Sequence, residues 1–248
     1  MATLTVLNGT SVTSTDTCTL SVTPASGSLL GVAVLINSYP SGSPSISTKT
    51  WNGNDLGAVR KSQQGVGATY LLSNIYAYEV ASSATANIVI VGGGTYTQIS
   101  VAAYQITGYN TGAIIGATAG EAVGSATQVF SGGTALATAV GDVVIDGCII
   151  DVNSTDRWLE INSGTTSGYN SDPRPGNIPL VKAASGYVTA AGSTVDIGWL
   201  SRIFDSGPIP NPAEGAHAAV VVQTAAAGST ASAFFAYTRN HLTAGAVS

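Results

Sequence analysis

The chain has 248 residues and a net charge of −5, and only 8% of its residues are charged, so few charges oppose its association with other chains. Its eight Lys and Arg residues do not cluster, which argues against a nucleic-acid partner, because phosphates need a basic stripe. No apolar run is long enough to cross a bilayer, and residues 1–17 lack the basic and apolar regions of a secretory signal. We therefore expect no membrane partner and synthesis in a cytosol.

Short strands separated by turn residues dominate the first half of the sequence. Apolar and polar residues alternate over 3–6 and 17–22, which is typical of half-buried strands. Apolar or aromatic runs then follow at 28–37, 69–82, 87–93 and 97–108, each bounded by Gly, Ser or Thr.

The glycines Gly92, Gly93 and Gly94 follow a β-branched run, as at the start of a dinucleotide-binding fold. That fold needs a third glycine where Thr97 stands, and then a helix. The following residues, 97–108, have the pattern of a strand instead. We therefore predict a tight turn that joins two antiparallel strands, and no bound cofactor.

Strand-like runs continue in the second half, at 141–151, 157–162, 185–193, 193–201, 217–225 and 231–240. More than ten strands without helices between them predict an all-β protein, an antiparallel β-sandwich that is jelly-roll-like. The two halves are weakly similar. They are either the two layers of one jelly roll or two tandem sandwiches with a boundary near 110–140. We expect a single domain over residues 1–248.

Candidate catalytic residues are few. Nucleophilic catalysis needs a base such as histidine, and only His217 and His241 exist. We expect both to be surface or strand-end residues, with His217 on the same strand face as Ala219 and Val221. Asp142 and Asp146 could form a hydrolytic carboxylate pair. We expect them instead to be solubility charges or salt-bridge partners, and the chain to have no catalytic residue.

Metal sites are not expected either. Asp151–Asp156 offers oxygen ligands at alternate positions, but Asp156 and Asn162 occupy the places where a calcium loop needs Gly and Glu. A looser calcium site in this loop remains an alternative. Cys18 and Cys148 lie in strand-like runs, and we expect two buried thiols rather than a disulfide.

Two long loops are the candidate interface or ligand sites, because binding residues gather on loops. Residues 162–179 contain Tyr169, Asp172 and Arg174, and the proline-rich residues 205–215 contain Pro208 and Pro210. The alternative is that the loops only cover a sheet edge. Exposed aromatic residues could also form a sugar-stacking platform. For the three tryptophans, at 51, 158 and 199, we expect core positions.

Several segments occur in the order of a known β-sandwich module. They are Leu29-Leu30 with Val32 and Val34, Trp51-Asn52-Gly53 with Leu56, Tyr70-Leu71-Leu72, Asn87-Ile88-Val89-Ile90, Val101-Ala102-Ala103 with Ile106, and a second opening strand at 141–146. Over residues 28–152 the chain resembles a module found in phage virion proteins and bacterial surface proteins. It departs in its low charge and in Tyr70, where tryptophan is common.

The resemblance implies a jelly-roll-like sandwich used for display, assembly or adhesion, and it brings no catalytic residues. With the low charge, we expect a structural component of a bacteriophage virion, with a capsid decoration or cement protein first. Its expected partners are capsid or tail proteins of the same virion and further copies of itself, in a homo-oligomer such as a trimer. The alternatives are a tail or head-fibre protein, a carbohydrate-binding adhesin and a hydrolase.

Overall fold

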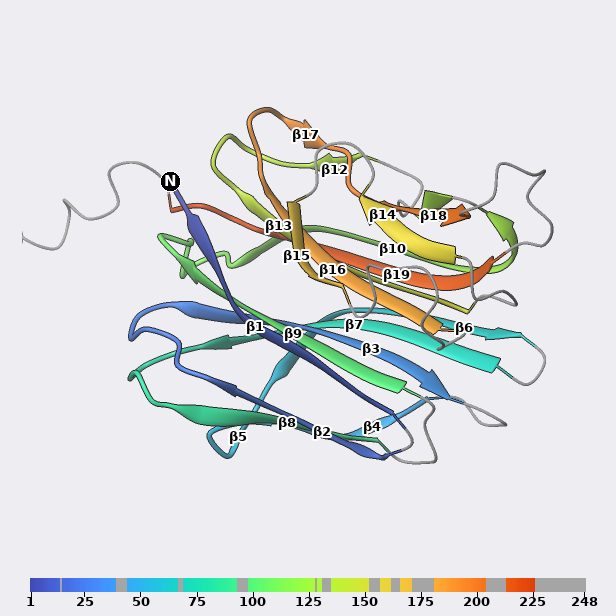
Figure 1. Cartoon of the computed structure of the whole chain (residues 1–248). Coiled ribbons are helices and arrows are strands. Elements are labelled where there is room, and N and C mark those ends of the chain that lie inside the picture. Colours follow the sequence, from blue (N-terminus) through green and yellow to red (C-terminus); the bar gives the residue numbers. More distant parts are fainter. Residues whose placement is uncertain are drawn as a thin grey trace, which may run out of the picture.

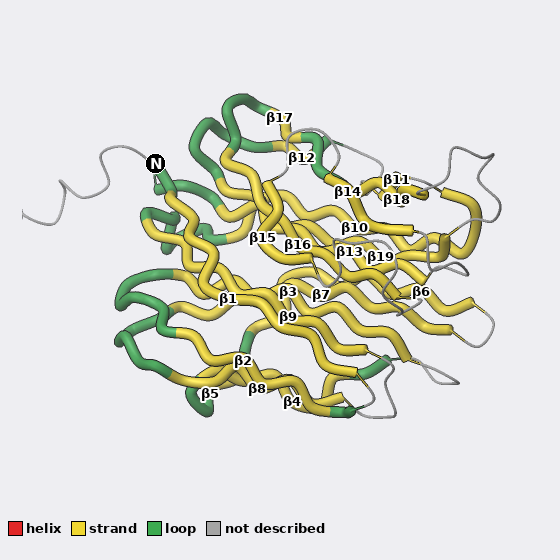
Figure 2. The backbone as a smooth tube through the Cα atoms, viewed as in Figure 1, coloured by secondary structure: helices red, strands yellow, loops and turns green. Residues whose placement is uncertain are grey.

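The computed structural model describes residues 1–13, 15–38, 44–66, 69–92, 98–127, 129–130, 135–151, 157–161, 166–170, 181–203 and 213–225. Nineteen strands lie within these residues, and none of them forms a helix (Figure 2). The predicted all-β class is therefore confirmed.

The first half of the chain contains nine strands. They are β1 (Thr3–Thr13), β2 (Thr17–Val22), β3 (Leu29–Ser38), β4 (Ile46–Trp51), β5 (Asn54–Asp55), β6 (Gly57–Val66), β7 (Thr69–Glu79), β8 (Ala86–Gly92) and β9 (Gln98–Thr107). They form a five-stranded sheet, β1-β9-β3-β7-β6, and a four-stranded sheet, β2-β8-β4-β5. We call them inner sheet 1 and outer sheet 1. Apart from the hairpins β4-β5 and β6-β7, successive strands cross from one sheet to the other, which is jelly-roll connectivity.

The second half contains ten strands. They are β10 (Ile115–Thr127), β11 (Val129–Phe130), β12 (Leu136–Ala137), β13 (Val143–Asp151), β14 (Arg157–Ile161), β15 (Thr166–Asn170), β16 (Val181–Thr189), β17 (Thr194–Val195), β18 (Trp199–Ile203) and β19 (Ala213–Val222). Inner sheet 2 has the order β10-β19-β13-β16-β15, which matches inner sheet 1 position by position. The two-stranded sheet β12-β17 and the three-stranded sheet β11-β18-β14 form the outer layer of this half.

The two halves stack through their inner sheets (Figure 1). From bottom to top, Figure 1 shows outer sheet 1, inner sheet 1, inner sheet 2 and the outer layer of the second half. Each half therefore builds its own pair of layers, and no described sheet mixes strands of both halves. That residues 1–248 form a single domain stays a prediction.

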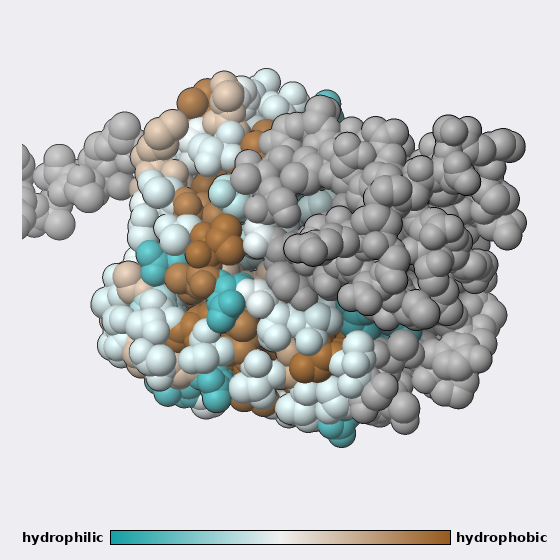
Figure 3. Space-filling model, in the orientation of Figure 1, coloured by the Kyte–Doolittle hydropathy of each residue, from teal (hydrophilic) through white to brown (hydrophobic). Residues whose placement is uncertain are grey.

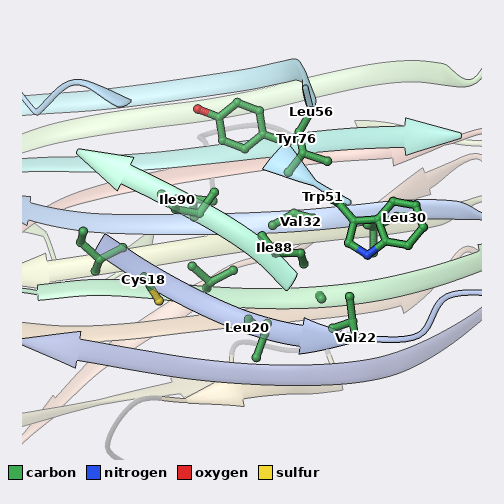
Figure 4. Close-up of a cluster of buried hydrophobic side chains, with 14 of the residues drawn as sticks. Cys18, Leu20, Val22, Leu30, Val32, Trp51, Leu56, Tyr76, Ile88 and Ile90 are labelled. Atoms are coloured by element: carbon green, nitrogen blue, oxygen red, sulfur yellow. The ribbon is translucent and has the colours of Figure 1, made fainter. Parts of the chain in front are cut away.

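Buried apolar clusters fill each of the spaces between these layers. The first outer core, between the two sheets of the first half, contains Cys18, Leu30, Trp51, Ile88 and Ile90 among others (Figure 4). The inner core joins Leu29, Ala33 and Ile106 of inner sheet 1 to Val143, Ile145 and Val220 of inner sheet 2. The second outer core includes Leu136, Val144, Val195 and Val221. Strands that contribute to two cores are apolar on both faces, which explains the continuous apolar runs.

The packing of the two inner sheets is approximately two-fold symmetric. The equivalent strands β3 and β13 pack against each other, β6 packs against β10, and β15 correspondingly contacts β1. At the crossing of β3 and β13, Gly31 leaves room for Ile145. A Cβ atom on Gly31 would lie 2.5 Å from Cδ1 of Ile145, so the absence of a side chain there sets how closely the halves approach.

We expect Gly31→Val to lower the free energy of unfolding by about 1–3 kcal/mol, because added atoms overpack the inner core. Urea denaturation measures the change. Gly192→Val is the matched control, since a Cβ atom there has no neighbour within 4 Å. Adding Ile145→Ala should make the Gly31→Val substitution less costly. Equal losses at both glycines would contradict close packing at the β3–β13 crossing.

The predicted hairpin at the three glycines is wrong. β8 pairs with β2 and β4 in outer sheet 1, whereas β9 pairs with β1 and β3 in inner sheet 1. The segment after Gly92 therefore connects two different sheets, and residues 93–97 themselves lie outside the described part. The predicted strand after the glycines is confirmed as β9.

Candidate functional site

The most elaborate polar cluster surrounds the carboxylate of Asp146, on β13. Oδ1 accepts a hydrogen bond of 2.9 Å from the backbone N–H of Gly186, and Oδ2 accepts one of 3.0 Å from Nε1 of Trp199. Nε2 of His217 lies 3.3 Å from Oδ2. Asp146, Trp199 and His217 are all fully buried between β13, β18 and β19. We call these three residues the Asp146 cluster.

The prediction that His217 is a surface or strand-end residue is wrong. It lies in the middle of β19 with no exposed surface, because the outer layer of the second half covers it. The predicted face is right, since Ala219 and Val221 belong to the second outer core on the same side. Nε2 of His217 is directed at the carboxylate of Asp146. Its Nδ1 is buried and has no partner among the described residues.

Asp142 also has a structural role that the sequence interpretation missed. It is buried just before β13, where Oδ2 accepts a 2.8 Å hydrogen bond from the N–H of Ala139. Oδ1 accepts one of the same length from the N–H of Thr224. The carboxylate therefore ties the turn before β13 to the segment after β19. Neither Asp142 nor Asp146 is the exposed solubility charge that we expected.

A second polar group lies on the opposite face of inner sheet 2, inside the inner core. The hydroxyls of Tyr104 and Ser185 are 2.6 Å apart, and Ser185 Oγ donates to the carbonyl of Asp146 at 2.6 Å. Ser73 Oγ donates to the carbonyl of Gly147 at 2.8 Å. Burial is the main cause that raises the pKa of Tyr104, so its hydroxyl stays protonated. The Tyr104–Ser185 and Ser73–Gly147 hydrogen bonds join the two halves.

Both polar groups thus hold strands together rather than face an open cleft. Every oxygen of the Asp142 and Asp146 carboxylates accepts a hydrogen bond from a backbone or side-chain donor. Within the described ranges no three His, Cys, Asp or Glu residues gather in a way that could hold a metal ion. No helix capable of spanning a membrane occurs among the same residues.

The exposed feature that stands out is the outer edge of β1. β1 is an edge strand of inner sheet 1, and no strand of the described part pairs with its outer side. It has eleven residues with neither charge nor proline. Proteins usually protect such an edge with charged residues, proline or a short strand. Its single protective feature is a bulge between Val6 and Asn8.

The apolar side chains of β1 lie on both faces of the sheet. Leu4 packs partly against the inner core, whereas Leu7 and Val12 pack partly against the first outer core. Val6 is 36% exposed. Hydrophobic surface gathers on the side of the molecule that β1 crosses (Figures 1 and 3). We call residues Thr3–Thr13 with this apolar border the β1 edge.

The strand at the opposite edge of inner sheet 1 contains charged residues in its sequence. β6, at the other end of inner sheet 1, carries Arg60 and Lys61 in its sequence. Beside it in outer sheet 1, Nζ of Lys49 forms an ion pair of 2.7 Å with Asp55. The two edge strands therefore differ in the feature that normally prevents strand addition, and among the described strands none pairs with the outer side of β1.

The predicted loop sites are almost entirely outside the described residues. Tyr169 lies in β15, whose backbone pairs with β16. Asp172, Arg174, Pro208 and Pro210 lie outside the described part, as do His241 and residues 152–156 of the calcium alternative. Interface or ligand roles for the two loops therefore stay predictions. Of the tryptophans, Trp51 and Trp199 are confirmed as core residues.

Both cysteines are buried and neither forms a disulfide, as expected. Burial raises the pKa of the Cys18 thiol from 9.0 to about 11. The thiol of the unfolded chain therefore ionises at lower pH than that of the folded chain. The stability that the neutral thiol contributes is fully present below pH 9 and is lost as pH rises through about 11.

We expect the free energy of unfolding to fall between pH 9 and 11, and Cys18 to account for roughly 3 kcal/mol of the fall. Urea denaturation across this range measures it, and Cys18→Ala should flatten the profile by that amount. A later decline should persist in both proteins, because burial and Glu79 raise the pKa of Tyr109 to about 12. Identical profiles below pH 11 would contradict the assignment to Cys18.

Comparison of the chain with protein-family models, with curated proteins and with solved structures found no match.

Proposed function

We propose that this protein is a structural component of a bacteriophage virion, a capsid decoration or cement protein that works through protein–protein contacts. The observation that carries the proposal is the β1 edge: an eleven-residue strand without charge or proline, on a stack of two jelly-roll units. An open edge of this kind offers backbone hydrogen bonds and apolar area, which are the means of assembly rather than of chemistry.

Two further features support the proposal. The resemblance of residues 28–152 to a module of phage virion and bacterial surface proteins favours display or assembly. Because few residues are charged, little electrostatic repulsion opposes association of the chain with other chains. This property suits a permanent subunit of a larger assembly. The titratable side chains of the Asp146 cluster already have a structural role in the core, and they need no reaction to explain them.

The test has two steps. Light scattering on a sizing column gives the solution mass of the purified chain, and we expect a closed oligomer such as a trimer. Co-sedimentation with capsids that lack decoration proteins then tests binding to a particle, and we expect saturable binding. A chain that is monomeric at high concentration and does not bind any capsid or tail preparation would overturn the proposal. Saturable glycan binding by such a monomer would instead support the adhesin.

A further inference from the structure

We infer that the β1 edge receives residues 231–240, ASAFFAYTRN, from a second copy of this chain, which add to inner sheet 1 as an antiparallel strand. The inference deepens the proposed function and rests on it, since it names the partner through which copies associate. It rests on the open edge, on where the described part of the chain ends, and on the sequence of the segment.

The described part ends beside the start of β1. The N–H of Ala225 donates to the carbonyl of Gly108 at 2.9 Å, and Tyr109 pairs with Thr224. Met1 lies beside Gly108 and Gly141, because a Cβ atom on either glycine would meet it within about 3.3 Å. Residues 226–248 therefore depart from the end of the molecule at which β1 begins.

The segment 231–240 has the composition of a strand that belongs in a sheet. It is rich in aromatic residues, it has no proline or glycine, and Arg239 is its only charge. Neighbouring side chains of a strand point to opposite faces, so Phe234 and Phe235 would lie on different faces of the sheet. The β1 edge offers partly exposed apolar side chains on both faces, with Leu4 on one and Leu7 on the other.

Direction and reach favour a second copy over the same chain. Every described ladder is antiparallel, and antiparallel pairing is slightly the more stable per residue. β1 runs away from the end where Ala225 lies, over about 33 Å. To lie antiparallel on its own β1, the segment would first have to reach the far end of that strand. Residues 226–230 span at most about 18 Å, so within one chain only parallel pairing is possible.

Cysteine cross-linking in the full chain tests the inference. One preparation carries Val6→Cys, and a second, isotopically labelled, carries Phe235→Cys. After mixing and mild oxidation we expect a disulfide-linked dimer with one chain of each kind, identified by mass. The yield should alternate with a period of two when the second cysteine is moved along residues 232–238, because alternate side chains face the same side. Ser193→Cys, in an exposed loop, replaces Val6→Cys in the control.

Substitutions that add a charge give an independent readout. Val6→Lys should abolish the assembled species in light scattering, because a lysine on the edge opposes strand addition. Ser193→Lys adds the same charge elsewhere and should leave the assembled species unchanged. Circular dichroism and thermal unfolding of both variants establish that the fold is retained.

Three results would overturn the inference that residues 231–240 of a second copy add to the β1 edge. The first is a disulfide within a single chain of the double variant Val6→Cys/Phe235→Cys, which would place the segment on its own β1. The second is a mixed dimer no more abundant than with Ser193→Cys. The third is an unchanged mass for Val6→Lys. If any of these results occurs in a protein that still forms a closed oligomer, only the inference about residues 231–240 is wrong. If the protein is a monomer that binds no particle, the proposed function is wrong as well.

Discussion

Replacing Asp146 with alanine is expected to lower the free energy of unfolding by about 3–5 kcal/mol, because three buried polar groups lose their partner at about 1–3 kcal/mol each. The substitution leaves the N–H of Gly186, Nε1 of Trp199 and Nε2 of His217 in the core without their hydrogen-bond partner. Buried donors without acceptors pay their full desolvation cost. Urea denaturation of the wild-type and variant chains measures the difference.

Two comparison variants sharpen the experiment. Asp146→Asn keeps the shape but supplies one acceptor oxygen in place of two, so its cost should fall between those of wild type and Asp146→Ala. Asp196→Ala removes an exposed carboxylate from the same half and should change stability by less than about 0.5 kcal/mol. If Asp146→Ala were as stable as Asp196→Ala, the cluster would contribute nothing to the fold.

Replacing Trp51 with alanine is expected to cost about 3–5 kcal/mol as well, through a different mechanism. Its side chain is 2% exposed in the first outer core (Figure 4), and its ring centroid lies 5.7 Å from that of Tyr78. Alanine removes this apolar contact area and leaves a cavity where β4 meets β8 and the inner sheet. Chemical denaturation again gives the free energy of unfolding.

Trp51→Phe separates packing from hydrogen bonding. Nε1 of Trp51 is buried without a partner among the described residues, so the indole contributes area rather than a hydrogen bond. Phenylalanine should therefore retain most of the stability that alanine loses. A Phe variant as unstable as the Ala variant would show that the indole N–H has a partner in the folded protein.

Local sequence patterns predicted the interior strands of the two inner sheets and missed three of their four edge strands, β6, β10 and β15. β3, β7, β9 and β13 have apolar or β-branched runs that need burial, so their periodicity is visible in the sequence. β10 is made largely of small residues and lies at an edge, where little burial is required of it. It occupies the region that we had considered as a boundary. Its strand character comes from pairing with β19, which no local window contains.

The Asp146 cluster was equally beyond reach from the sequence. Its members, at 146, 199 and 217, meet only because β18 is laid over inner sheet 2. One signal was present: Asp146 interrupts an otherwise apolar run, and a carboxylate within such a run is buried with partners more often than it is exposed. The glycine turn failed for a related reason, since strand partners depend on topology and not on the turn residues.

Because the two halves are in tandem in one chain, the contacts between halves and the contacts between separate chains respond differently to dilution. The two inner sheets belong to one polypeptide and are joined by the short segment 108–114, so each half meets the other at the high effective concentration of a linked pair. The packing of the two inner sheets therefore does not depend on protein concentration. Their facing surfaces can differ in sequence and still stay in contact. Contacts between separate chains have no such tether. They weaken as the protein is diluted. Dilution therefore distinguishes the contacts between the two halves, which persist, from the contacts between chains, which dissociate.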